Sequence, residues 1–196
     1  MTSHALAATD PETASATDFY IETLAIVGVG LIGGSFALAL KKAGCVGRVL
    51  GVGRQPQTLE RALALGIIDE IATLEQAART SDLVMLAAPV GAFGALFEAM
   101  SGHLSDKTLV CDGGSTKGNV VAAARASLGA RIGQFVPTHP IAGSHESGPQ
   151  AAFADLYRDR NVVLCPLTEN SPSAVATISQ AWQASGAHVV SMTVEQ

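Results

Sequence analysis

The sequence has few basic residues and no long uninterrupted apolar run. Lysine and arginine number 12 against 17 acidic residues, a formal net charge of -5. A protein that grips a nucleic-acid backbone needs a basic face, so this balance disfavours nucleic acid as a partner. No stretch approaches the roughly 18 apolar residues that span a bilayer, so we expect no membrane protein. Hydrophobic residues make up 48% of the chain, which is ample for a buried core.

The beginning of the chain also lacks the marks of a targeting segment. Residues 1–18 have neither a basic start nor an apolar centre, and they contain no arginine; this disfavours both a signal peptide and a transit peptide. We expect residues 1–20 to be a flexible tail. A length of 196 residues suits one domain, which we place at residues 21–196.

Cysteine is scarce as well. Cys45, Cys111 and Cys165 are odd in number, widely spaced and set in apolar runs. Such residues are typical of buried, reduced thiols in a cytoplasmic protein, which is the location we expect. We expect no metal site.

From Thr23 onward, short apolar runs alternate with amphipathic stretches, as in a parallel sheet with crossover helices. We predict an α/β fold of the Rossmann type, a doubly wound, mainly parallel sheet with helices on both faces. The last predicted helix and strand are expected to extend that sheet. The predicted strands are 24–27, 48–52, 83–87, 108–111, 132–136, 161–165 and 188–191, and the predicted helices are 31–43, 56–65, 117–128 and 172–185.

The first predicted strand runs directly into Gly28-Val-Gly30-Leu31-Ile32-Gly33, and a helix follows at once. In that context three glycines indicate a dinucleotide site. Gly28 permits a tight turn, Gly30 lets the backbone approach a pyrophosphate, and Gly33 lets the helix pack closely on the strand. The free N–H groups and the dipole of the helix start attract the diphosphate, so we assign all five named residues to the cofactor. A glycine-rich turn without a ligand is the alternative.

Two further segments are expected beside the cofactor. The strand predicted at 48–52 ends in Gly53-Arg54, with no acidic residue to accept hydrogen bonds from a ribose 2′-hydroxyl. An arginine there can pair with a 2′-phosphate, so we predict NADP in preference to NAD, with NAD possible and a solvated Arg54 as the alternative. Ala88-Pro89 follows the strand predicted at 83–87, at the edge where ligands bind in such sheets.

Asp112-Gly-Gly-Ser115-Thr-Lys117 follows another predicted strand at the same edge. Ser115 lies where a helix is expected to begin. It either caps that helix or hydrogen-bonds the substrate or a catalytic histidine. We expect Lys117 to be a solvated helix residue or an electrostatic aid.

Among the five histidines, His139 combines a strand end, a following proline and a Gly-Ser loop at the expected active edge. The proline favours extended backbone at His139, which holds the ring in one direction. Removing hydride from an alcohol carbon needs a base for the hydroxyl proton, and imidazole titrates near working pH. His139 is therefore our candidate base, and His145 is a minor one.

Three ordered motifs carry a specific resemblance: Gly28-Val-Gly-Leu-Ile-Gly-Gly-Ser35, Asp112-Gly-Gly-Ser-Thr-Lys-Gly118 and His139-Pro-Ile-Ala-Gly143. Together they resemble the prephenate/arogenate dehydrogenase family of tyrosine biosynthesis, over residues 24–192. The resemblance implies oxidation of a cyclohexadienol with loss of carbon dioxide. The substrate would be prephenate, giving 4-hydroxyphenylpyruvate, or arogenate, giving tyrosine, with hydride passing to NAD(P).

The same resemblance implies roles for individual residues. His139 would hydrogen-bond the ring hydroxyl and draw off its proton. Ser115 would orient His139 and the substrate, and Ser144 would contact the substrate. Members of the family continue into a helical domain that forms a homodimer and supplies an arginine for a substrate carboxylate. This sequence ends where that domain would begin, so we expect the chain alone to bind cofactor and to turn over weakly or not at all.

Two other functions remain open on the sequence. One is a different reductase with this cofactor fold, such as a β-hydroxyacid dehydrogenase or an imine reductase, although those usually present a catalytic lysine or aspartate from a later helix. The other is a non-catalytic NADP-binding module.

Overall fold

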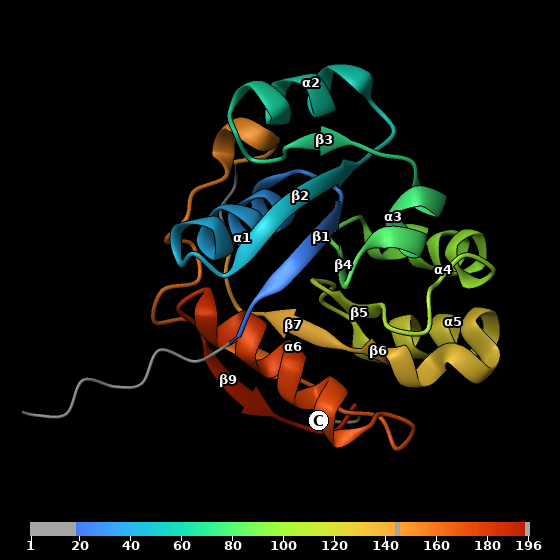
Figure 1. Ribbon diagram of the computed structural model, residues 1–196. Coiled ribbons are helices and arrows are strands. Elements are labelled where there is room, and N and C mark those ends of the chain that lie inside the picture. The colour runs from blue at the N-terminus through green and yellow to red at the C-terminus, as the bar shows by residue number, and fades with distance from the viewer. Residues whose placement is uncertain (1–18, 144–145, 195–196) are drawn as a thin grey trace, which may run out of the picture.

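The computed structural model describes residues 19–143 and 146–194 and is built around a six-stranded parallel sheet (Figure 1). The strand order is β3-β2-β1-β4-β5-β6, the order of a doubly wound dinucleotide-binding fold, so the predicted fold class is confirmed. The strands are β1 (Ile21–Val27), β2 (Val46–Val52), β3 (Glu70–Ile71), β4 (Leu83–Leu86), β5 (Leu109–Asp112) and β6 (Phe135–Val136).

Helices cover both faces of this sheet. Successive strand residues point to opposite sides, and because both sets are apolar, each face needs a layer of helices to bury it. In β1, Leu24 and Ile26 pack into one core and Ala25 and Val27 into the other. The first core includes residues of α1 (Leu31–Lys42), α2 (Pro56–Ala64) and α6 (Pro172–Ala184). The second includes residues of α3 (Leu74–Thr80), α4 (Phe93–Ser101) and α5 (Lys117–Leu128), which lie together on one side of the sheet in Figure 1. Among the described residues, no helix has the length and apolar character to cross a bilayer.

A second sheet of three strands follows the first, and here the prediction was wrong. β7 (Thr138–Pro140), β8 (Asn161–Leu164) and β9 (His188–Ser191) pair with one another, β7 and β8 antiparallel, and do not extend the main sheet. Pro137, between β6 and β7, has no N–H to continue the pairing with β5. The next N–H, of Thr138, instead donates to a side-chain oxygen of Asp112 at 2.9 Å. The chain therefore leaves the main sheet at this point.

The prediction of a strand at 132–136 is also wrong for most of these residues. Residues Gly129–Gln134 form a 3-10 turn, and only Phe135 and Val136 pair with β5. Ile132 is 8% exposed, so the turn buries this apolar side chain without strand pairing.

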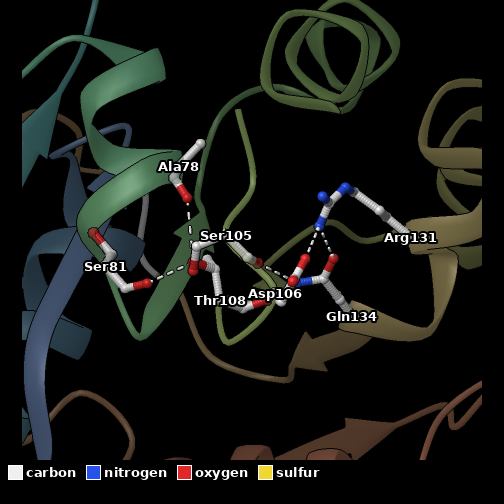
Figure 2. Close-up of polar contacts among 7 residues, drawn as sticks. All are labelled: Ala78, Ser81, Ser105, Asp106, Thr108, Arg131 and Gln134. Carbon is white, nitrogen blue, oxygen red and sulfur yellow. Dashed lines mark hydrogen bonds and ion pairs between the residues drawn. The ribbon is translucent and has the colours of Figure 1, made fainter. Parts of the chain in front are cut away.

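At the amino ends of β4, β5 and β6, a polar cluster joins three connections of the fold (Figure 2). The hydroxyl of Thr108 lies 2.7 Å from the carbonyl of Ser81 and 2.8 Å from the hydroxyl of Ser105. The amide of Gln134 donates to the carbonyls of Ser105 and Thr108, both at 2.7 Å. These bonds satisfy polar groups of the strand starts, at the edge of the sheet opposite to the site described next.

Candidate functional site

The carboxyl ends of four strands lie level with one another. Val27 of β1 pairs with Val52 of β2 and with Leu86 of β4, and Leu86 pairs with Asp112 of β5. The loops after these strands therefore share one edge. The strand order reverses between β1 and β4, and open α/β sheets bind ligands in the crevice at such a reversal.

Each glycine of the first loop meets a different steric demand. Gly28 has φ +100, and a Cβ there would lie 2.5 Å from the carbonyl oxygen of Ala87. A Cβ at Gly33 would lie 2.4 Å from the carbonyl oxygen of Gly28, so this glycine is required by the packing of α1 against the loop. A Cβ at Gly30 would meet nothing within 4 Å. The open space beside Gly30 is where a ligand can approach the backbone.

The start of α1 is free to bind an anion. Gly30 is the N-cap and has no side chain to accept from the first amides, and the first turn has no acidic residue. The first helical bond runs from Gly34 N to Gly30 O at 2.8 Å, so the preceding amides have no partner within the helix. Leu31 is 8% exposed, so its backbone and not its side chain is available. Uncompensated amides at a helix start attract a diphosphate.

Ile32 lies between this loop and the loop after β5. A Cβ at Gly113 would come within 2.9 Å of the Ile32 Cγ2, so the two loops touch only because position 113 is a glycine. Gly53, exposed after β2, lies at the same edge. The start of α1 and the loop after β5 are thus in direct contact.

Arg54, Ala88 and Pro89 also lie along this edge. Arg54 follows β2, is exposed, and forms no hydrogen bond or ion pair with the described residues. Ala88 is half-buried after β4, and the exposed Pro89 precedes a short 3-10 turn at Val90–Ala92. The guanidinium of Arg54 is therefore free to pair with a ligand.

Ser115 does not cap α5, so that reading of it was wrong. The N-cap is Thr116, whose side chain makes no capping hydrogen bond. Ser115 is exposed in the loop between β5 and α5. Between Ser115 and His139, both described residues, there is no hydrogen bond. Freed from a capping role, its hydroxyl is available at the sheet edge.

Lys117 is not solvated, so the first of the two roles expected for it was wrong and the electrostatic one stays a prediction. Its side chain is 7% exposed and its ammonium pairs with the fully buried carboxylate of Asp112. It also donates to the carbonyl of Thr138 at 2.5 Å. Asp112 accepts in addition from the backbone amides of Thr138 and Gly114, each at 2.9 Å. One buried carboxylate thus joins the end of β5, the start of α5 and the start of β7.

His139 follows this network in β7 and is half-buried, with Val163 of β8 as its strand partner. Burial lowers the pKa of His139 from 6.5, and the positive charge of Lys117 lowers it further, against an opposing effect of Asp112. The lowered pKa favours the neutral imidazole, the form that accepts a proton.

Some predicted site residues lie outside what the structure describes. Ser144, the predicted substrate contact, and His145, the minor candidate base, are both among them. Within the described ranges 19–143 and 146–194, no group of three or more histidine, cysteine, aspartate or glutamate residues could hold a metal ion.

Comparison with known proteins gives a consistent result. Residues 36–191 match the family model described as "Prephenate dehydrogenase, nucleotide-binding domain". The chain is 36% identical over 174 residues to a cyclohexadienyl dehydrogenase from Zymomonas mobilis, covering 88% of this chain and 58% of the relative. It is 34% identical over 177 residues to a prephenate dehydrogenase from Bacillus subtilis, covering 89% of this chain and 47% of the relative. The chain thus spans only part of the length of both relatives.

Solved structures agree with these relatives. The crystal structure of prephenate dehydrogenase from A. aeolicus in complex with hydroxyphenyl propionate and NAD+ superimposes with a TM-score of 0.83 at 34% identity, covering 91% of this chain and 62% of that one. A Synechocystis arogenate dehydrogenase gives a TM-score of 0.79 at 27% identity, covering 87% of this chain and 59% of that one.

Proposed function

The chain belongs to the prephenate dehydrogenase family, as its nucleotide-binding domain, and from this premise we propose that it serves an NADP-preferring dehydrogenase that oxidises and decarboxylates prephenate or arogenate. One observation carries the proposal: the open start of α1 and the segment that leads from β6 to the half-buried imidazole of His139 lie at the same edge of one sheet. A dinucleotide bound there would accept a hydride from the substrate.

His139 would act as the base in this reaction. Its neutral imidazole would accept the proton of the ring hydroxyl as the hydride leaves the carbon that carries this hydroxyl, and the ring carboxylate would depart as carbon dioxide. The electron pair that the carboxylate leaves behind makes the ring an aromatic phenolate, whose oxygen would take the proton back from His139. Formation of the aromatic ring makes the reaction favourable. The lowered pKa of His139 supports the role, because a base must be unprotonated before it acts.

Ser115 and Ser144 would contact the substrate. The exposed hydroxyl of Ser115, without a capping duty, is free to orient the substrate and His139. Ser144 follows the histidine motif by sequence, and its role is proposed on the motif alone.

The cofactor preference rests on Arg54. No acidic side chain occupies the positions directly after β2, and the guanidinium of Arg54 is exposed and unpaired among the described residues. A guanidinium pairs well with a phosphate in two parallel hydrogen bonds. This supports a 2′-phosphorylated dinucleotide.

Full activity would need a further part, because the relatives are longer than this chain. We propose that a helical domain forms the dimer and supplies the arginine for a substrate carboxylate. A cytoplasmic location is part of the same proposal. None of the three cysteines, which all lie in the described part of the chain, forms a disulfide, as is usual in a reducing compartment.

The test is a binding measurement followed by an assay. NADP+ and NAD+ are titrated into the chain by calorimetry. Reduced cofactor is then followed with prephenate and with arogenate, for the chain alone and for the chain joined to the C-terminal part of the Zymomonas mobilis relative. We expect binding in both forms and turnover in the joined form. Tight binding with no turnover in either form would favour a non-catalytic module, and no binding would refute the proposal.

A further inference from the structure

The glycine motif continues into Gly34 and Ser35, two residues that we do not assign to the cofactor site. A Cβ at Gly34 would lie 2.8 Å from the Cβ of Ala152, so the helix and the segment around Ala152 are packed as closely as a glycine permits. Ser35 is fully buried, and its hydroxyl oxygen accepts from the backbone N–H of Phe153 at 3.0 Å. Both residues therefore face a segment that follows the histidine motif in the chain.

Tyr157 makes a third contact from the same segment. Its hydroxyl donates to the carbonyl of Ile32, in the first turn of α1, at 2.6 Å. The ring is fully buried and packs edge-on against Trp182, with centroids 5.1 Å apart, and against Phe36, at 6.4 Å. Burial raises the pKa of Tyr157, so the phenol keeps its proton and remains a donor. We call residues 152–157 the strut.

Three residues after the strut the chain enters β8, and β8 pairs with β7 so that Val163 lies opposite His139. One continuous stretch of chain therefore contacts the first turns of α1 at one end and the strand of the imidazole at the other. The two halves of the site, the anion-binding amides and the base, are joined through it.

We propose that the strut positions the cofactor loop relative to His139, with Ser35 and Tyr157 as positioning residues. The inference rests on the proposed function, because it concerns how the dinucleotide site is held ready. When only part of the population has the binding-competent loop, the apparent Kd rises in inverse proportion to that fraction. Loosening the strut lowers the fraction and weakens cofactor binding, although no strut residue is assigned to the cofactor.

The first experiment is a steric test with a built-in rescue. Gly34→Ala places a methyl group against Ala152 and is expected to raise the Kd for NADP+ about three- to tenfold in calorimetric titration of the chain, the range of one displaced hydrogen bond. Ala152→Gly removes the opposing methyl group. The double variant should return the Kd to within about twofold of the unmodified value. A double variant as weak as Gly34→Ala alone would overturn the proposal.

The second experiment removes a hydrogen bond and keeps the packing. Tyr157→Phe deletes the donor to Ile32 and is expected to raise the Kd for NADP+ about three- to tenfold. The matched control is Ser185→Ala, which deletes a buried hydroxyl that donates to the carbonyl of Trp182 at 2.6 Å. Its hydroxyl bonds to the same tryptophan and forms no hydrogen bond with the described residues of α1. Its variant should lose similar stability in urea unfolding and leave the Kd unchanged.

Each outcome is informative. An unchanged Kd in Tyr157→Phe, or an equal rise in Ser185→Ala, would reduce Tyr157 to a structural residue and overturn the inference while the proposed function stands. If Tyr157→Phe does not fold, the Gly34→Ala and Ala152→Gly pair decides alone. Failure of the unmodified chain to bind any dinucleotide would instead refute the proposed function, and the inference with it.

Discussion

Lys117 donates from its buried ammonium to the carboxylate of Asp112, and this ion pair lies directly behind the strand of the candidate base. Thr138, next to His139, binds both partners, through its N–H to Asp112 and through its carbonyl to Lys117. The pair thus fixes the backbone at the start of β7. Burial is the main cause of the lowered pKa of His139; the charge of Lys117 lowers this pKa further, and Asp112 opposes the change.

Lys117→Met should be strongly destabilising. The substitution leaves the carboxylate of Asp112 buried without a counter-charge, and breaking a buried pair in this way costs about 3–5 kcal/mol. Urea unfolding measures the change. Adding Asp112→Asn to Lys117→Met removes the stranded charge and should recover part of the loss. A fall of less than about 1 kcal/mol in Lys117→Met would contradict the assigned role of the pair.

The imidazole of His139 should titrate below 6.5 in an NMR titration of the chain, with His139→Gln to assign its signal. As pH falls, the imidazole of His139 binds a proton at a higher pH in the unfolded chain than in the folded chain. The contribution of the neutral imidazole to the free energy of unfolding is therefore present above pH 6.5 and is lost as pH falls through the lowered folded-state pKa. His139→Gln should flatten this acid dependence. A midpoint above 6.5 would disprove the prediction.

Catalysis gives an independent reading of the same residue. In the chain joined to a helical domain, His139→Ala should lower turnover by about 100- to 10,000-fold, the usual range for a lost acid–base group. The Kd for NADP+ should stay close to that of the unmodified protein. A drop in turnover below about tenfold would remove His139 from the role of base.

Much of the main sheet could be predicted because short apolar runs and glycine turns mark its strands and helices locally in the sequence. The helix at Lys117–Leu128 was predicted with its observed bounds, and the glycine loop was placed correctly between β1 and α1. Short elements were missed. The two residues of β3, Glu70 and Ile71, are both exposed and show no period, and α3 has only seven residues. Such elements are set by their neighbours and leave little pattern in the sequence.

The separate second sheet and the buried pair could not be predicted for a different reason. Both depend on contacts between residues far apart in the chain. Thr138 leaves the main sheet because its N–H finds the side chain of Asp112, 26 positions earlier. Lys117 has the spacing of an ordinary solvated helix residue, and only the closeness of β5, α5 and β7 buries it. The strut residue Tyr157, 125 positions from Ile32, gave no local signal at all.

Two glycines of the loop should respond differently to alanine. At Gly30 the methyl group enters open space, so Gly30→Ala should fold with nearly unchanged stability and yet lose affinity for NADP+, because the methyl group occupies the approach of the diphosphate. At Gly33 the methyl group meets the carbonyl oxygen of Gly28, so Gly33→Ala should lose about 1–3 kcal/mol of stability or more. Thermal unfolding and calorimetry separate the two. Unchanged affinity in Gly30→Ala would place the diphosphate elsewhere.

Arg54 should set the cofactor preference. Arg54→Ala should raise the Kd for NADP+ about 10- to 100-fold, the value of a hydrogen-bonded charge, and leave the Kd for NAD+ within about threefold. Arg61→Ala, on the exposed face of α2, is the matched control for a loss of positive charge. If the unmodified chain bound both cofactors equally well, the preference for NADP would be wrong.

The polar cluster of Figure 2 should affect stability and not binding. Thr108 is fully buried, and its hydroxyl contacts the carbonyls of Ala78, at 3.2 Å, and Ser81, at 2.7 Å. Thr108→Val keeps the shape and removes the donor to the carbonyl of Ser81, which costs about 1–3 kcal/mol. The carbonyl of Ala78 still accepts from the backbone N–H of Ser105, at 3.2 Å. Thr177→Val, which loses a bond to Ser173 on the half-exposed face of α6, should cost about 0.5 kcal/mol or less.

Cofactor affinity then tells the two edges of the sheet apart. The cluster lies at the amino ends of the strands, and the proposed cofactor loops lie at the carboxyl ends. A folded Thr108→Val protein should therefore bind NADP+ as the unmodified chain does, measured well below its unfolding temperature. If its Kd rose as in Tyr157→Phe, general loosening of the fold would explain both results, and the strut would have no special part in holding the cofactor loop.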